Sequence, residues 1–185
     1  WRIVPRVISL QASDFELFGL PTAFALDRSH LDLQWKSLQR EAHPDRFASE
    51  GAAAQRIAMQ WSVRINEAYS RLKDPLKRAA YLCELHGAAV NAENNTSMPP
   101  AFLIQQMEWR EALDDCKALK EADAKIEALE TLLEEVDASH AQVLAQAADL
   151  MDVDHNFAGA VGQVRALMFI EKFAHEVQLG LDACT

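Results

Sequence analysis

The sequence predicts an all-α protein built in two parts, and three observations support this prediction. Apolar residues recur at helical spacing over most of the chain, which has only 6 Gly and 6 Pro among 185 residues. One long polar, turn-rich stretch, residues 91–100, interrupts that pattern. Residues 1–86 hold 12 Lys and Arg against 10 Asp and Glu, whereas residues 87–185 hold 6 against 18. The acidic second part argues against nucleic acid as its partner.

Composition also bounds the environment of the protein. No apolar run approaches the ~20 residues of a membrane span, so we expect a soluble protein with no membrane partner. Cys83, Cys116 and Cys184 are too widely spaced for a disulfide framework or a zinc site. We expect free thiols in a reducing cytoplasm, with Cys83 and Cys116 in the core. Residues 1–12 lack the apolar centre of a secretory signal and are interpreted as a leader or a frayed end.

Four helices are expected in the first part. Asp14 can cap a short first helix that ends at Gly19. The second helix should start at Asp27 or Ser29 and bury the stripe Leu31, Trp35, Leu38 and Ala42. The third should start within residues 48–56, run to about Lys73 and bury Ile57, Trp61, Ile65, Ala68, Tyr69 and Leu72. A shorter fourth helix is expected over residues 76–85.

A polar corner, residues 40–47, lies between the second and third helices. Pro44 biases His43 away from the helical region and ends the preceding helix. Two amphipathic helices joined by a short connection pack antiparallel, which places His43, Pro44 and Asp45 at the tip of a hairpin. Arg28, Lys36 and Arg40 share one face of the second helix, and Arg46 lies just beyond it. We interpret this face as a positive docking strip; the alternative is an ordinary solvated face.

The second part is expected to be an antiparallel three-helix bundle. Its helices are predicted over residues 100–119, 122–150 and 155–181. In the middle helix, residues separated alternately by three and four positions form a seam that should face the neighbouring helices. The seam consists of Ile126, Leu129, Leu133, Val136, His140, Val143, Ala147 and Leu150. The third carries the stripe Phe157, Val161, Val164 and Met168. We expect His140 to be a satisfied interhelical residue rather than a metal ligand.

The first helix of this bundle has two candidate faces. A core stripe is formed by Phe102, Gln106, Trp109, Leu113 and Cys116. Leu103, Ile104 and Met107 point elsewhere and share their side with Glu108, Glu111 and Asp115. Either the core face is wide, or these three form an exposed apolar patch rimmed by carboxylates, which is typical of a protein-binding surface. We favour the patch.

The hairpin with His43-Pro44-Asp45 at its tip resembles a J-domain. The segment Asp14-Phe15-Glu16-Leu17-Phe18-Gly19-Leu20-Pro21 resembles the first helix of that family, and residues 66–75 resemble the end of its third. Residues 78–87 and 101–111 resemble segments specific to the HscB family, the J-type co-chaperones of iron-sulfur cluster biogenesis. The resemblance covers about residues 13–181.

This resemblance implies a J-domain over residues 13–87, a linker over 88–99 and a scaffold-binding domain over 100–185. It implies that the J-domain docks on HscA, a specialised DnaK-class ATPase chaperone, and accelerates its ATP hydrolysis, while the bundle binds the cluster scaffold protein IscU. The implied chaperone-binding residues are His43, Pro44 and Asp45 with the basic residues Arg28, Lys36, Arg40 and Arg46. The implied scaffold-binding residues are Leu103, Ile104, Met107, Glu108, Glu111, Asp115 and Phe169.

Two departures from the family pattern bear on this expectation. Arg46 stands where many relatives have lysine, which keeps the charge but not the side-chain geometry. The zinc-binding Cys motif of some eukaryotic relatives is absent, so the bacterial, cytoplasmic form is favoured and neither metal nor cofactor is expected.

Two other hypotheses remain open. One makes His43 and Asp45 part of a hydrolytic or metal site, but no third ligand or nucleophile stands at a recognisable spacing, so we expect a protein that is not an enzyme. The other keeps the J-domain and gives the bundle a different client.

Overall fold

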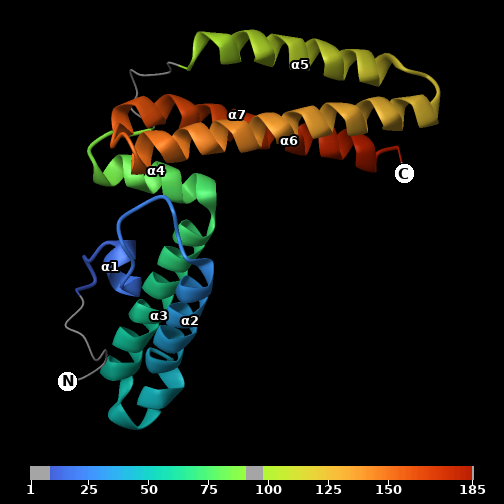
Figure 1. Ribbon diagram of the computed structural model, residues 1–185. Coiled ribbons are helices and arrows are strands. Elements are labelled where there is room, and N and C mark those ends of the chain that lie inside the picture. The colour runs from blue at the N-terminus through green and yellow to red at the C-terminus, as the bar shows by residue number, and fades with distance from the viewer. Residues whose placement is uncertain (1–8, 91–97, 185) are drawn as a thin grey trace. The chain divides into compact units, whose positions relative to one another are not determined.

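A computed structural model describes residues 9–90 and 98–184 of the chain. The described residues form seven α-helices and one 3-10 helix and contain no β-strand (Figure 1), which confirms the all-α prediction. They fall into two compact units, one extending through Leu82 and the other starting at Cys83. This division lies inside helix α4 (Pro75–Leu85), ahead of the linker expected at residues 88–99. Residues 1–8 of the expected leader and 91–97 of that linker lie outside the described residues.

Helix α1 (Asp14–Phe18) is held at both ends by its own sequence. The Ser13 hydroxyl accepts a hydrogen bond from the Glu16 N–H at 3.2 Å, and the Glu16 carboxylate accepts one from the Ser13 N–H at 2.8 Å. Gly19 ends the helix with φ of 63°, a left-handed value that favours glycine. The expectation that Asp14 caps this helix was wrong, because Ser13 has the extended backbone and the free hydroxyl that a cap requires.

Asp14 instead joins α1 to helix α3 (Ala52–Lys73). Its carboxylate is fully buried and lies 2.7 Å from Arg64 Nη2 and 3.2 Å from Arg71 Nη1. Neither carboxylate oxygen accepts a well-aligned hydrogen bond, so the contact is mainly an attraction between charges. Arg64 also donates to the Ala12 carbonyl at 2.8 Å, which ties the chain before α1 to the same point.

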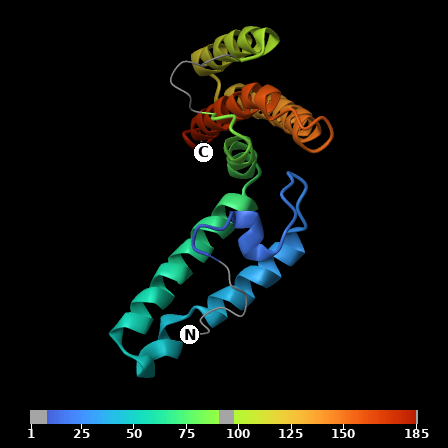
Figure 2. The ribbon, with the colours of Figure 1, turned by 90° about the vertical axis from the view of Figure 1, so that its left-hand side faces the viewer.

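Helices α2 (Arg28–Glu41) and α3 form the antiparallel hairpin of the first unit (Figures 1 and 2). Asp27 caps α2 by accepting from the His30 N–H at 3.0 Å. Leu31, Leu38 and Ala42 are buried as expected, whereas Trp35 stays partly exposed and stacks on Tyr69 with ring centroids 4.6 Å apart. The stripe of α2 is therefore buried along its length except at Trp35.

The third helix starts within the predicted range of residues 48–56, at Ala52. Residues 44–50 form a 3-10 helix, and Gly51 follows it with φ of 93°, which a residue with a side chain rarely adopts. Consequently residues 48–50 belong to the 3-10 helix, and α3 begins directly after Gly51. Its buried face carries Trp61, Ile65, Ala68 and Leu72, whereas Ile57 and Tyr69 are only partly buried.

The second unit is a three-helix bundle of α5 (Pro100–Ala118), α6 (Ala122–Asp152) and α7 (Phe157–Asp182). Helices α6 and α7 lie side by side over their length, and α5 runs alongside them (Figures 1 and 2). The predicted helix ends agree with the observed ones to within two residues. The core of α7 is formed by Ala160, Val161, Val164, Leu167, Ile170, Phe173 and Val177.

The predicted seam of the bundle was wrong at several positions. In α6 the buried residues include Leu132 and Met151, whereas Leu133 and Leu150 are partly exposed. Ile126 and His140, also placed on the seam, are partly exposed as well. A straight helix drifts by about 20° per heptad relative to a strict three-and-four alternation, so a seam extrapolated over 31 residues leaves the core face. Met168 of α7, predicted to be in its stripe, is 36% exposed.

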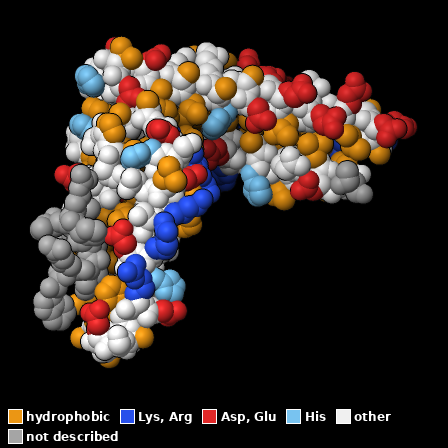
Figure 3. Space-filling view, turned by 60° about the horizontal axis from the view of Figure 1, so that its bottom comes forward, with side chains coloured by type: hydrophobic (Ala, Val, Ile, Leu, Met, Phe, Trp, Pro, Cys, Tyr) orange, Lys and Arg blue, Asp and Glu red, His pale blue; other side chains and the backbone are white. Residues whose placement is uncertain are grey.

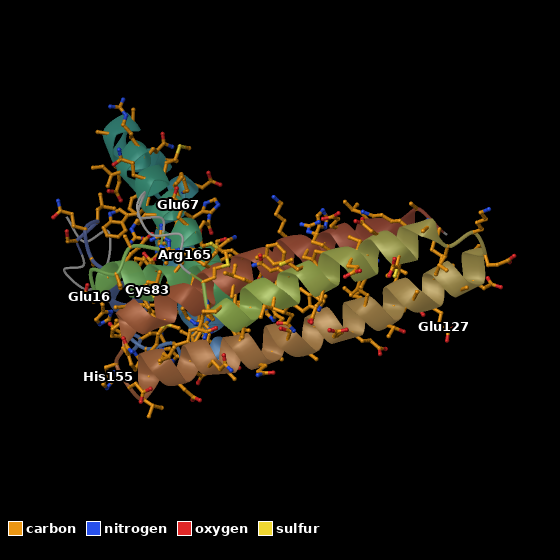
Figure 4. The ribbon with its side chains drawn as sticks, turned by 90° about the horizontal axis from the view of Figure 1, so that it is seen from above. Glu16, Glu67, Cys83, Glu127, His155 and Arg165 are labelled. Carbon is orange, nitrogen blue, oxygen red and sulfur yellow. The ribbon has the colours of Figure 1, made fainter. Side chains whose placement is uncertain are left out.

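The chain at the end of α4 is fastened to α7 within the second unit. The His86 ring stacks on Phe157 with centroids 3.6 Å apart, and Arg165 donates two hydrogen bonds to the Val90 carbonyl, at 2.9 and 2.7 Å. Figure 4 shows Arg165 and Cys83 in this region. Burial raises the pKa of the Cys83 thiol to about 11, so this thiol stays protonated at neutral pH. Cys83 and Cys116 are both buried, as expected.

None of the described helices is both long enough and apolar enough to cross a membrane.

The ion pairs of Asp14 give a stability prediction. Replacing Arg64 by alanine should lower the free energy of unfolding by about 3 kcal/mol, because it strands a buried carboxylate that Arg71 still partly compensates. Urea unfolding followed by circular dichroism measures the change. Arg56, exposed on α3, is the matched control, and its alanine variant should stay within about 0.5 kcal/mol of the wild type. An Arg64→Ala protein as stable as the control would contradict the proposed role of the buried pair.

Candidate protein-binding sites

The tip of the α2–α3 hairpin presents an exposed carboxylate on a fixed backbone. His43 has ψ of 125° ahead of Pro44, and its Nδ1 accepts a hydrogen bond from the Asp45 N–H at 3.3 Å. The Asp45 side chain is 90% exposed, and its carboxylate is 3.6 Å from His43 Nδ1. The imidazole and the proline thus shape the turn, and the acid remains available to a partner.

Phe47 holds this turn against the hairpin. It is 8% exposed and belongs to a buried cluster with Ala54 and Ala58 of α3. The small side chains of the two alanines leave room for the phenyl ring, so the 3-10 helix is anchored on its inner side. Asp45, two residues earlier, consequently faces solvent.

A groove of about 610 Å³ runs beside the tip on the face of α2. Most of its wall is apolar, formed in part by the aliphatic stems of cationic side chains whose charged ends form its rim. Figure 3 shows Lys and Arg side chains gathered along this unit. The residues lining the groove are Trp35, Lys36, Gln39, Arg40, His43 and Arg46.

Hydrogen bonds keep the walls of the groove in place. Trp35 Nε1 and Gln39 Nε2 both donate to the Asn66 side-chain oxygen, at 3.0 and 2.6 Å, and the Ser62 hydroxyl donates to Gln39 Oε1 at 3.1 Å. Arg46 donates to the Arg40 carbonyl at 3.2 Å. The groove is therefore largely preformed, which limits the ordering cost when a partner binds.

Of the predicted basic strip, the structure brings Lys36, Arg40 and Arg46 together around the groove and leaves Arg28 outside it. Arg28 Nε donates to Asp32 at 2.7 Å, and its guanidinium lies 5.7 Å from the centroid of the Tyr69 ring. This hydrogen bond lowers the pKa of the Asp32 carboxyl, so the pair stays ionised and the charge of Arg28 is locally compensated. Sequence reasoning missed Trp35 and Gln39 as groove residues, although Trp35, Gln39 and His43 follow one another at intervals of four residues, which places them on one side of the helix.

The second candidate site is the outer face of α5. Leu103, Ile104 and Met107 are 49%, 61% and 74% exposed, whereas Phe102, Trp109, Leu113 and Cys116 of the same helix are buried. The wide-core alternative is thus not what the fold adopts. We call Leu103, Ile104 and Met107, together with the exposed acids Glu108, Glu111 and Asp115 beside them, the α5 patch.

Phe169 of α7, the remaining predicted scaffold-binding residue, is partly buried. Its ring packs edge-on against Phe102 at 5.8 Å and stacks on Phe173 at 6.0 Å. The Arg110 guanidinium lies 5.7 Å from the centroid of the Phe169 ring. Arg110 was missed by the sequence reasoning, because its contact with α7 depends on how two helices pack.

Arg110 and Lys117 also tie α5 to α7 through one acid. Both donate to Glu176, Lys117 at 3.3 Å. The hydrogen bond from Arg110 lowers the pKa of the Glu176 carboxyl. This exposed cluster supplements the stacking of Trp109 on Phe173 at 5.6 Å in holding α5 to the bundle.

No group of three or more His, Cys, Asp or Glu side chains suited to a metal ion occurs within residues 9–90 and 98–184. His140 faces Glu171 across the α6–α7 interface, with Nε2 3.4 Å from the carboxylate, which confirms the interhelical role expected for it.

The antiparallel hairpin with His43, Pro44 and Asp45 at its tip places the protein in the class of J-type co-chaperones, and comparison with known proteins agrees. Residues 98–178 match the family described as "HSCB C-terminal oligomerisation domain". A "Co-chaperone protein HscB homolog" of Burkholderia multivorans is 50% identical over 171 residues, which cover 92% of this chain and 95% of the relative. The corresponding protein of Burkholderia mallei is 49% identical over the same shares.

Solved structures give the same result. The structure of the chaperone HscB from Vibrio cholerae superposes with a TM-score of 0.79 at 37% identity and covers 94% of this chain and 100% of that one. Human co-chaperone protein HscB, at 24% identity, shares the fold with a TM-score of 0.81, covering 94% of this chain and 84% of its own. This chain belongs to the HscB family of co-chaperones. Its relatives are named co-chaperones, which implies a non-enzymatic role.

The Glu176 cluster predicts a pH dependence. The folded-state pKa of Glu176 lies below its ordinary value of 4.5, so its stabilising effect is present above pH 4.5 and is lost as the pH falls through the folded-state pKa. At pH 7 the Glu176→Gln protein should be less stable than the wild type by at most about 1 kcal/mol, because the pair is exposed.

Thermal unfolding at pH 7 and at pH 3 tests this, and the difference between the two proteins should shrink at pH 3. Glu127 points away from the bundle (Figure 4) and is the control, because its Gln variant should show no such convergence. If the stability difference between the wild type and the Glu176→Gln protein widened toward pH 3, the lowered pKa assigned to Glu176 would be refuted.

Proposed function

We propose that this protein stimulates the ATPase of a DnaK-class chaperone, HscA, through its His-Pro-Asp tip and delivers the iron-sulfur scaffold protein IscU to it. The observation that carries the proposal is the exposed Asp45 carboxylate beside the cation-rimmed groove, in a chain of the HscB family. In this proposal both partners are met in the bacterial cytoplasm, and the protein takes part in the maturation of iron-sulfur proteins.

Docking on the chaperone uses charges of both signs. The Asp45 carboxylate can accept two parallel hydrogen bonds from an arginine of the ATPase, the strongest neutralisation open to an exposed acid. Lys36, Arg40 and Arg46 receive acidic groups of the same partner around the groove. Docking speeds hydrolysis if the hydrolysis-competent state of the ATPase binds this surface more tightly than its other states do.

Scaffold binding uses the α5 patch. Full burial of one large apolar side chain is worth about 1.5–3 kcal/mol. Leu103, Ile104 and Met107 together would contribute at most roughly 4.5–9 kcal/mol, which is comparable to an association cost of roughly 4–15 kcal/mol. The acids Glu108, Glu111 and Asp115 add attraction for a basic partner, and Phe169 is part of the proposed site. The patch therefore supports a modest, reversible affinity, which suits a protein that hands over its cargo.

Carrying both sites on one chain raises the concentration of the scaffold at the chaperone without any new contact. Stimulation should accordingly be greater with scaffold and co-chaperone together than the sum of their separate effects.

The alternative client hypothesis keeps the J-domain mechanism and changes the partner of the α5 patch. The alternative differs from the proposed function in one measurable respect: the IscU-type scaffold would not bind the α5 patch. The hydrolytic or metal-site hypothesis is tested by metal analysis of the purified protein.

The role of Asp45 can be tested by the Asp45→Asn protein. Loss of the charge should reduce stimulation of the cognate chaperone ATPase at least tenfold, on the basis of the roughly 1.5–3 kcal/mol of a charged hydrogen bond. The helical circular dichroism spectrum and the scaffold affinity should not change, because the side chain is 90% exposed.

Glu50 ends the same 3-10 helix, is exposed and serves as the control. Its Gln variant should stimulate like the wild type. If the Asp45→Asn protein stimulated the chaperone ATPase as strongly as the wild type, the proposed J-domain mechanism would be ruled out.

The α5 patch can be tested by changing Leu103, Ile104 and Met107 together to alanine. Scaffold affinity, measured by calorimetry, should fall at least about 30-fold, because the three changes remove apolar area worth about 2 kcal/mol or more. ATPase stimulation in the absence of scaffold should persist.

Met59 and Val63 of α3 are similarly exposed, at 59% and 52%, and their double alanine variant is the control. Unchanged scaffold affinity in the triple variant would favour the alternative client or a different surface.

A further inference from the structure

A second groove lies on the flank of α5 that faces α6. It has a volume of about 470 Å³, within the roughly 300–1,000 Å³ of ligand-binding clefts. Pro99 and Ala101 lie at one end, and residues of α5, α6 and α7 form its walls. The residues of α6 and α7 that line it belong neither to the chaperone site nor to the α5 patch.

Four glutamines converge on this groove from three helices. Gln105 comes from α5, Gln142 and Gln146 from α6, and Gln163 from α7. Ser139 donates to the Gln105 oxygen at 3.4 Å, a long contact, and within the part of the chain that the structure describes the side chains of the other three make no hydrogen bond. Each carboxamide therefore presents both a donor and an acceptor to the groove.

The charge of the groove restricts its occupant. Its lining holds no Lys, Arg or His, and Glu108 is its one carboxylate among the described residues. Anionic metabolites would meet repulsion and no cation. A polypeptide in extended conformation fits better, because its alternating N–H and C=O groups match side chains that donate and accept.

The groove is continuous with the α5 patch. Ile104 and Glu108 belong to both, since they line the groove on one side and form part of the exposed apolar and acidic face on the other. A partner seated on Leu103 and Met107 would thus place neighbouring residues of its chain at the mouth of the groove. The patch by itself supports only modest affinity, so further contacts here have a measurable effect.

We propose that this glutamine-lined groove receives an extended segment of the scaffold protein, bound through its backbone. The inference rests on the proposed scaffold-binding function. It extends the scaffold-binding site from the α5 patch to the glutamine-lined groove. Backbone pairing makes this part of the site tolerant of the segment's sequence, whereas the α5 patch selects its apolar side chains.

The test compares four full-length proteins for affinity to the IscU-type scaffold by calorimetry. They are the wild type, Gln142→Ala/Gln146→Ala, the α5-patch triple variant and Gln178→Ala. Gln178 is exposed on α7, bonds to Asp182 at 2.9 Å and does not line the groove. We expect about tenfold weaker binding for the groove variant, as for the loss of one or two neutral hydrogen bonds, and no change for Gln178→Ala.

Two results would overturn the inference while leaving the proposed function intact. One is wild-type affinity in the groove variant together with loss in the patch variant. The other is a fall in self-association of the groove variant with unchanged scaffold affinity, which would assign the groove to a second copy of the chain. If the wild-type protein does not bind the scaffold, the proposed function and this inference both fail.

A spectroscopic readout separates backbone binding from a general loss of structure. Overlapping synthetic peptides of the scaffold are added to the full-length, ¹⁵N-labelled protein, and the side-chain amide resonances of Gln142, Gln146 and Gln163 are followed. One region of the scaffold sequence should shift them, with Gln178 unaffected. Equal shifts at Gln178, or none at the three groove residues at saturation, would refute the assignment. Alanine favours helix at these exposed positions of α6, so the groove variant should fold normally.

Discussion

The pairing of α2 with α3 is the interaction on which the first unit depends. It buries the apolar stripe of both helices and uses Asn66 and Gln39 to join their exposed edges. The same contacts wall the groove, so one set of interactions stabilises the hairpin and shapes the candidate chaperone site. Phe47 completes this by anchoring the tip against α3, which leaves Asp45 outside. An acid on such a preformed support would lose little conformational entropy if a partner bound it.

Helix α5 shows how one helix can serve a core and a partner. Its narrow buried stripe, centred on Trp109, holds it to the bundle, and Trp109 also donates to Glu135 of α6 at 3.0 Å. The rest of its circumference stays exposed, so apolar and acidic residues share the outer face. Attachment through a few aromatic contacts and the Glu176 cluster leaves clefts on its flank, and the glutamine-lined groove is one of them.

The two candidate sites have opposite electrostatic characters. At the first, Lys and Arg side chains line the groove beside the exposed Asp45; at the second, carboxylates flank apolar side chains. The uneven division of charge along the chain therefore corresponds to two surfaces that attract different partners and repel each other's. The same opposition limits binding of a partner at the wrong site.

The sequence by itself determined the helices, the hairpin with Asp45 at its tip and the composition of the α5 patch, because local periodicity and turn chemistry encode these features. It misplaced the cap of α1, since Ser13 and Asp14 are both suitable capping residues and only their surroundings decide between them. It also misplaced parts of the α6 seam, since a regular spacing drifts off the core face of a long helix. Only the tertiary structure decided that Asp14 is buried between arginines and that Arg28 lies outside the groove. It alone brought glutamines from three helices together, because such proximity arises from packing between distant segments and leaves no local pattern in the chain.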